Sequence, residues 1–196
     1  MSGPISTLFP EGEVLPESEA LLLPSGYRAR IRRITAQSRP LIAAAMLRLS
    51  PESSRRRFFT PRFRLSEREL DHLTSPDGVH HVALGVCGHA ADGTLEGIAA
   101  ARFIRDADDA STAEFALTVI DAFQHQGIGR TLFPRLVAAG RRLGVRRLRG
   151  LMVPDNVQML GLLRTFAPAA RYAYDGEILT AVVDLDRVAW PRLALA

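Results

Sequence analysis

The sequence predicts a single α/β (α+β) domain in which about seven strands form a central sheet flanked by helices. Its 196 residues suit one domain, and a hydrophobic fraction of 47% with 23% charged residues is ordinary for a chain that folds around a core. After residue 78, short apolar runs of strand length alternate with longer helical patterns. Together these observations exclude a disordered or fibrous protein.

An acidic leader is expected at residues 1–24. Four glutamates and four prolines fall in this segment and no arginine does, which is typical of a mobile segment or one draped over the surface. The folded domain is then predicted over residues 25–186, with a C-terminal tail at residues 187–196.

The first half of the predicted domain contains one strand and three helices. Residues 27–34 are mixed but suit a strand, and residues 36–49 are rich in alanine and leucine, as helices are. Ser50 followed by Pro51 is an N-cap with proline at the first helical position, which predicts a helix up to residue 59. A capping-box pattern begins the third helix, over residues 66–73.

The second half is predicted to consist mainly of strands, with two helices between them. Residues 113–119 alternate between two faces, with Phe115 on one face and Glu114 on the other. The predicted strands cover residues 79–87, 95–104, 113–119 and 146–153, followed by a hairpin around Asp175-Gly176; the helices cover residues 128–143 and 156–165.

A glycine loop between the strand at 113–119 and the following helix carries the clearest functional signal. Gly127 and Gly129 let a phosphate approach the backbone, and the free N–H groups and dipole of the following helix favour its negative charge. A P-loop is excluded because the chain contains no lysine. A dinucleotide fingerprint is weak because Leu132 stands where a third small residue is needed.

All 25 basic residues are arginine, and the net charge is +4. Coding bias explains this composition most simply, and an arginine-lined surface for phosphate or acidic partners is the functional alternative. The excess is too small to indicate nucleic-acid binding by itself. Outside the leader, the chain contains 17 of the 21 acidic residues and all 25 arginines. This excess of positive charge suits a polyanionic cofactor. The arginines at 55–57 either select an acidic surface or form a solvated face.

The pattern Gln/Arg-x-x-Gly-x-Gly/Ala is met by Gln124, Gly127 and Gly129, and it resembles the pyrophosphate loop of the GNAT superfamily of N-acetyltransferases. The order of predicted elements is also that of the GNAT fold, which implies a mixed, mostly antiparallel sheet that is splayed at the acetyl-CoA site. Asn156 looks like the family's cofactor-binding asparagine. The resemblance implies no metal and the following acetyl-CoA contacts: Leu117, Val119, Gln124, His125, Gln126, Gly127, Ile128, Gly129, Arg130 and Asn156.

A narrower resemblance, to the acetyltransferase domain of bacterial Pat-type protein lysine acetyltransferases, covers most of the predicted domain. It rests on residues 26–32, 49–53, 57–59, 65–70 and 113–116. It implies that a lysine of a protein such as an acyl-CoA synthetase is acetylated. It also implies that Glu114 is the general base, because an ammonium group with a pKa near 10.4 must lose a proton before it attacks. A surface carboxylate on a strand is the alternative interpretation of Glu114.

Two positions depart from the family pattern. Leu163 stands where many GNAT enzymes have a tyrosine that protonates the leaving thiolate, and Ala167-Pro168 replaces a usual Gly-Phe. The proton donor is therefore left open. Two alternative functions also stay open: acetylation of a small amine or a protein N-terminus, and a non-catalytic module that binds acyl-CoA.

Histidines at 80, 81 and 89 with Cys87 do not have the spacing of a zinc site, so no metal is expected. A lone cysteine cannot form an internal disulfide, and the cytoplasm is the expected compartment. No signal peptide and no apolar run of membrane-spanning length is present, so no membrane association is expected. The protein is expected to be a monomer or a homodimer.

Overall fold

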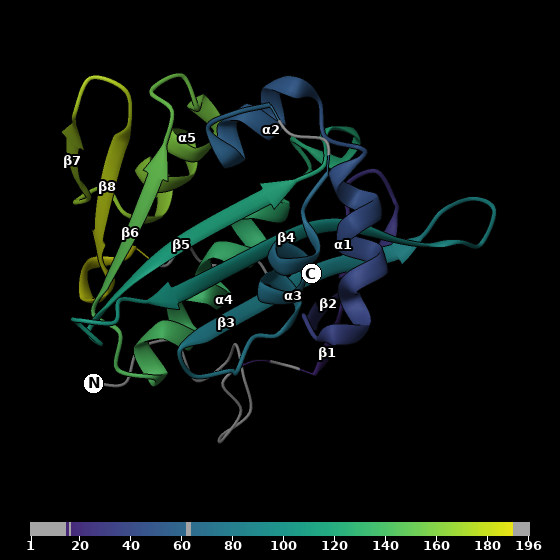
Figure 1. The fold of residues 1–196 in the computed structure, drawn as a ribbon, viewed down its shortest axis with the longest axis horizontal. Coiled ribbons are helices and arrows are strands. Elements are labelled where there is room, and N and C mark those ends of the chain that lie inside the picture. Colours follow the sequence, from purple (N-terminus) through teal and green to yellow (C-terminus); the bar gives the residue numbers. More distant parts are fainter. Residues whose placement is uncertain (1–14, 16, 62–63, 190–196) are drawn as a thin grey trace.

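Eight strands form one sheet in the computed structural model, which describes residue 15, residues 17–61 and residues 64–189 (Figure 1). Their order in the sheet is β1-β2-β3-β4-β5-β6-β8-β7. Only β5 and β6 pair in parallel; the other neighbouring pairs are antiparallel. The strands are β1 (Ser18–Leu22), β2 (Arg28–Arg33), β3 (His81–His89), β4 (Leu95–Arg105), β5 (Thr112–Val119), β6 (Arg147–Met152), β7 (Arg171–Tyr174) and β8 (Leu179–Asp184).

Helices cover both faces of this sheet. Figure 1 shows α1 and α3 in front of the sheet, α4 behind it, and α2 at the top, close to the ends of β5 and β6. The helices are α1 (Arg39–Met46), α2 (Pro51–Phe58), α3 (Glu67–Thr74), α4 (Ile128–Arg142) and α5 (Val157–Phe166). The mixed, mostly antiparallel α+β sheet flanked by helices is therefore confirmed. No helix in the described ranges is both long and apolar enough to cross a bilayer.

The caps expected from the sequence begin α2 and α3. The Ser50 hydroxyl oxygen accepts a hydrogen bond from the Ser53 N–H, with Pro51 at the first helical position. Ser66 and Glu69 form the predicted capping box of α3. Each cap satisfies N–H groups that the first turn of a helix leaves without a partner.

Aromatic rings pack in the core between the sheet and α4. Phe115 of β5 meets Phe133 of α4 edge-on, with ring centroids 5.5 Å apart, and Phe166 of α5 packs on the other side of Phe133. Phe115 also lies over Gly150 of β6, where an added Cβ would come within 2.5 Å of the Phe115 ring. A larger residue at 150 would therefore displace Phe115 or push β6 away from β5.

The edge strand β1 was not expected, because residues 18–22 fall in the predicted acidic leader. Half-buried and exposed positions alternate along β1, and Glu19 lies on the half-buried side, where the buried Arg135 of α4 pairs with it. Because Glu19 is charged but lies on the inner face of β1, the sequence lacks the alternation of apolar and polar residues that predicts a strand. The sheet therefore has eight strands in place of about seven. Of the predicted leader, the structure describes residues 15 and 17–24, and the other residues lie outside the described ranges.

Candidate active site

The sheet opens between β5 and β6. The two strands pair only where Thr112–Phe115 lies beside Arg147–Gly150. Beyond this point β5 continues to Val119 and β6 to Met152, and no further residues are paired. Because β4 and β8 hold the outer sides of these strands, the unpaired backbone groups face the gap between them. This is the splay that the resemblance to the GNAT fold implied.

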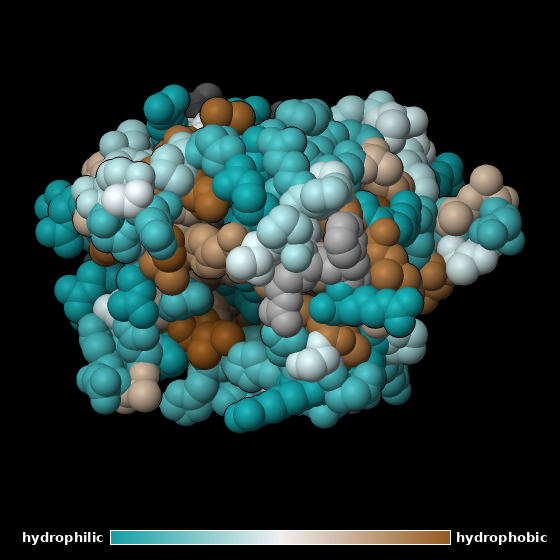
Figure 2. Space-filling model, turned by 45° about the horizontal axis from the view of Figure 1, so that its top comes forward, coloured by the Kyte–Doolittle hydropathy of each residue, from teal (hydrophilic) through white to brown (hydrophobic). Residues whose placement is uncertain are grey.

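A groove of about 450 Å³ occupies this opening, and we call it the β5–β6 groove. Figure 2 brings the top of Figure 1 forward and shows a hollow near the middle of that face, bordered by apolar residues and surrounded by hydrophilic ones. The groove is lined by Ser53, Arg56 and Arg57 of α2, by Leu117, Thr118 and Val119 of β5, by residues 123–125 and 127–130, and by Asn156, Gln158, Met159, Gly161 and Leu162.

The glycine loop (residues 124–130) sits at one end of the groove. Gly127 is the N-cap of α4 with a φ of 79°, and His125 is also in the left-handed region, with a φ of 61°. No side chain among the described residues caps the first turn of α4. Its N–H groups are therefore left to bind an anion such as a phosphate, supported by the helix dipole.

Gln124 has a role that the sequence did not indicate. Its side-chain amide donates hydrogen bonds to the Ser53 hydroxyl (3.0 Å) and to the Val119 carbonyl (3.1 Å). Asp121 accepts hydrogen bonds from the backbone and hydroxyl of Ser50 and from the Ser53 hydroxyl. These contacts join α2, the end of β5 and the glycine loop into one cluster, the Ser50–Asp121 cluster (Ser50, Ser53, Val119, Asp121, Gln124).

Electrostatics favour an ionised Asp121 in this cluster. Burial alone would raise the pKa of the carboxyl, but the hydrogen bonds from Ser50 and Ser53 outweigh it and hold the pKa below its usual value. The signal for this cluster was present in the sequence as the Leu-Ser-Pro-Glu-Ser segment at residues 49–53, but its partner, 71 residues away, was not visible there.

Two ion-pair and hydrogen-bond contacts tie α2 to α5 across the groove. Arg55 pairs with Asp155, which precedes α5, at 2.5 Å. Arg56 donates to the Gln158 side chain of α5 at 3.0 Å. Arg57 lies over the Phe58 ring, 4.9 Å from its centroid. All three arginines at 55–57 are thus engaged within the molecule and do not form a free solvated face. Asn156 lines the groove, and its side-chain oxygen caps α5 by accepting from the Met159 N–H (3.1 Å).

Glu114 lies on the face of β5 opposite to Phe115, together with Ala116 and Thr118. Its side chain is 49% exposed, and Arg149 approaches it to 4.0 Å while making a closer contact of 3.0 Å to Asp106. Arg57 is near enough to feel its charge: burial lowers the pKa of Arg57, and Glu114 opposes that shift. Glu114 lines neither the groove nor the cavity beside α1, but its carboxylate is open to solvent and can exchange protons with it.

A second cavity, of about 610 Å³, lies between α1 and the sheet, and we call it the α1 cavity. Arg57 and Thr118 line both the α1 cavity and the β5–β6 groove, so the two spaces are adjacent there. Arg102 of β4 is only 5% exposed in the cavity wall and donates to the Leu73 carbonyl at 3.0 Å. Its burial, and then the nearby Arg57, lower the pKa of Arg102 to about 9.

Leu163 is fully buried in the core and does not line the groove. None of the described residues that line the groove is a tyrosine. His81 stacks on His72, and burial with the charge of Arg102 lowers the pKa of His81 to about 4. The described residues contain no group of three His, Cys, Asp or Glu side chains that could hold a metal ion.

Comparisons with known proteins agree with this geometry. The profile of the acetyltransferase (GNAT) family matches residues 44–167. The acetyltransferase Pat of Mycolicibacterium smegmatis is 34% identical over 110 residues, which are 56% of this chain and 32% of that protein. The chain therefore matches only about a third of the length of that relative.

Among solved structures, the GNAT domain of the S. lividans PAT superimposes with a TM-score of 0.73 at 28% identity, covering 85% of this chain and 96% of that domain. A structure from Salmonella typhimurium that contains its cofactor acetyl-CoA has a TM-score of 0.60 at 16% identity, covering 84% and 98% of the two chains. The latter likeness concerns the fold alone.

Proposed function

The chain belongs to the GNAT family of acetyltransferases, and on that premise we propose that it transfers the acetyl group of acetyl-CoA to a lysine side chain of a protein in the cytoplasm. The observation that carries this proposal is the β5–β6 groove, which has an uncapped helix N-terminus at one end, while the solvent-open carboxylate of Glu114 belongs to the adjoining paired part of β5.

The donor would lie along the groove. The N–H groups of the glycine loop and of the first turn of α4 would hold the pyrophosphate, and Arg130 supplies a further positive charge nearby. The pantetheine arm, which contains two amide groups, would pass between β5 and β6, where unpaired backbone groups are available. The thioester would then lie near Thr118 and Val119.

Glu114 is the proposed general base. It removes a proton from the lysine ammonium, directly or through water, and the free amine attacks the thioester carbonyl. A backbone N–H near Val119 would stabilise the negative oxygen of the tetrahedral intermediate. When the C–S bond breaks, the C–N bond of the amide has formed. Of the two protons that leave the nitrogen, one ends on the CoA sulfur and one is released.

Similarity to the GNAT domain of the S. lividans PAT supports a protein lysine as the acceptor. An acyl-CoA synthetase is the acceptor that the Pat resemblance implies. The similarity covers only part of the M. smegmatis Pat protein, so its other properties are not carried over.

The test is an acceptor panel. The full chain is incubated with acetyl-CoA and, in separate reactions, with candidate acyl-CoA synthetases and small amines, while thiol release is followed and products are identified by mass spectrometry. We expect acetyl-lysine on a synthetase, and a Lys→Arg variant at the modified position should abolish the signal. The enzyme has no lysine, so every acetyl-lysine detected comes from the acceptor.

Two results would contradict the proposal. Turnover with small amines alone would favour a small-molecule acetyltransferase. Binding of acetyl-CoA in calorimetry with no turnover of any acceptor would favour a non-catalytic acyl-CoA-binding module.

A further inference from the structure

The α1 cavity is larger than the proposed reaction needs. Its volume of about 610 Å³ lies within the range of sites that enclose a whole small molecule, roughly 300–1,000 Å³. An acetyl group and the end of a lysine side chain would fill a small part of this space. Protein interiors are otherwise close-packed, so a cavity of this size next to the groove calls for an occupant.

Small residues on the sheet create the space. Gly85 of β3, Ala100 of β4 and Ala116 of β5 form part of the floor beneath α1. The helix comes close to the sheet at Gly97, where an added Cβ would lie 2.9 Å from the Leu41 carbonyl oxygen. Ala45 of α1 is only half-buried although it lines the cavity.

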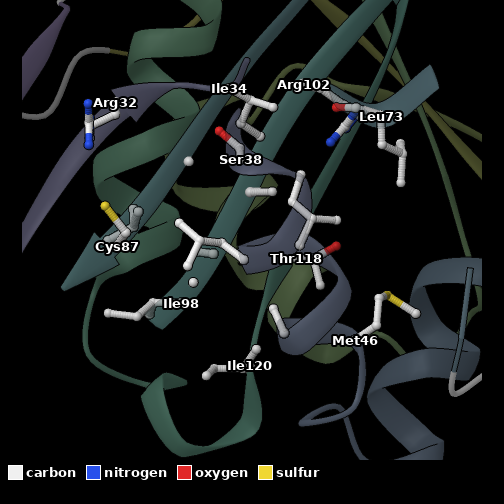
Figure 3. Close-up of a pocket in the computed structure, with 18 of the residues that line it drawn as sticks. Arg32, Ile34, Ser38, Met46, Leu73, Cys87, Ile98, Arg102, Thr118 and Ile120 are labelled. Carbon is white, nitrogen blue, oxygen red and sulfur yellow. The ribbon is translucent and has the colours of Figure 1, made fainter. Parts of the chain in front are cut away.

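The lining of the cavity includes residues that do not line the groove, such as Arg32 and Cys87. In Figure 3, Thr118 and Met46 lie on one side, and Arg32, Cys87 and Ile98 lie on the opposite side. Thr118 lines the groove as well, so a chain that begins at the proposed thioester position would continue beneath α1.

Apart from Arg57 and Thr118 on the groove side, several apolar residues line this part of the cavity. Met46, Leu49, Ile98 and Ile120 are all buried and line the cavity. The charged residues that line the cavity are four arginines and one glutamate: Arg32, Arg33, Arg57, Arg102 and Glu17. Arg102 is held by the Leu73 carbonyl and the His81 ring, and no carboxylate among the described residues pairs with it. A protonated amine would be repelled by Arg102, whereas a neutral hydrocarbon chain would meet the apolar walls without this cost.

We propose that the α1 cavity takes the acyl chain of donors longer than acetyl, so that the same site transfers medium-chain acyl groups from acyl-CoA. The inference rests on the proposed function for the position of the thioester. The reacting atoms are unchanged: the amide C–N bond forms, the C–S bond breaks, and CoA leaves as the thiol. Only the hydrocarbon beyond the carbonyl differs, and it lies under α1.

Binding provides a test that does not depend on the acceptor. Calorimetry of the full chain with acetyl-, butyryl-, hexanoyl- and octanoyl-CoA should give a Kd that falls with chain length. Each methylene that is fully buried favours binding about fourfold, so partial burial still predicts octanoyl-CoA to bind at least about tenfold more tightly than acetyl-CoA. A Kd that does not change with chain length would overturn the inference.

A matched pair of variants on α1 locates the effect. Ala45→Phe fills the cavity, whereas Ala44→Phe adds the same ring to the exposed side of the same helix. We expect Ala45→Phe to remove the preference for octanoyl-CoA while acetyl-CoA binds within about threefold of the parent, and Ala44→Phe to change neither. The smaller Ala45→Leu serves if the phenylalanine prevents folding. An octanoyl preference that survives in these cavity variants would contradict the proposal.

Transfer assays separate this inference from the proposed function. If acetyl groups reach a lysine but octanoyl-CoA neither binds more tightly nor transfers, only the further inference fails. If octanoyl-CoA binds more tightly through the cavity and no acceptor lysine is acylated, the proposed function fails and the chain-binding site stands. If Ala45→Phe raises only the KM of the acceptor, the cavity belongs to the acceptor and the inference is wrong.

Discussion

The two faces of β5 are packed in opposite ways. On the α4 face, Phe115 fills the space between Phe133 and Gly150 so tightly that an extra methyl group would collide with its ring. On the α1 face, Glu114, Ala116 and Thr118 border open space. The tight face fixes the strand, which allows the loose face to leave room for substrates and a reactive carboxylate.

The tight face should carry the largest energetic effect. Phe133→Ala removes a fully buried ring that contacts both Phe115 and Phe166, and we expect it to lower the free energy of unfolding by about 3–5 kcal/mol. Urea denaturation followed by circular dichroism measures this. A loss below about 1 kcal/mol would mean that the α4 face is not the rigid one.

The loose face should show the opposite behaviour, a large effect on catalysis without one on stability. Glu114→Gln is expected to lower kcat/KM about 10²-fold or more at pH 7 and to leave acetyl-CoA affinity unchanged. Because Glu114 is half-exposed, the free energy of unfolding should move by less than about 0.5 kcal/mol. An unchanged rate at pH 7 would remove Glu114 from the role of base.

The loose face should also be the acid-sensitive one. His81 is neutral in the folded protein because burial and Arg102 lower its pKa to about 4, whereas the unfolded chain binds a proton near pH 6.5. Stability from this group is therefore present above pH 6.5 and is lost as the pH falls towards 4, by roughly 2 kcal/mol at pH 4.5. His81→Gln should reduce that slope in unfolding curves recorded between pH 7 and 4.5; an identical slope would contradict the assignment.

Two helix caps on the loose face provide the smallest and most selective comparison. Ser50→Ala and Ser66→Ala each remove an N-cap, and each should cost about 1 kcal/mol of stability. Only Ser50 also bonds Asp121 of the Ser50–Asp121 cluster, so only Ser50→Ala should weaken acetyl-CoA binding. Calorimetry measures the acetyl-CoA affinity of both variants. Equal affinities would mean that the contacts between α2 and the glycine loop do not affect acetyl-CoA binding.

Much of this architecture could be predicted because it depends on local patterns. The alternation in β5, the caps at Ser50 and Ser66, and the glycine loop before α4 are all properties of neighbouring residues. The resemblance to the GNAT family added a further prediction, a sheet that is splayed at the acetyl-CoA site. The structure confirms that β5 and β6 diverge. The assignment of Glu114 as base and of the acetyl-CoA contacts stays a prediction.

Features that depend on distant partners were not predicted. Glu19 looked like part of an acidic leader because its partner, Arg135, lies 116 residues away in the sequence. Likewise, nothing near Gln124 indicates that its amide would bond Ser53. The α1 cavity arises from small side chains on three strands under one helix, and only the folded chain brings these together.

The divergence of β5 and β6 gives the sheet an edge in its interior. The unpaired N–H and C=O groups of an ordinary sheet edge can pair with another strand, and proteins usually cover such an edge or keep it short. Here a slender ligand with amide groups would serve as the missing strand. The peptide hydrogens of β5 beyond Phe115 that point toward β6 should therefore exchange with deuterated solvent quickly in the free protein. They should become slow when CoA is present, while those shared with β4 stay slow throughout.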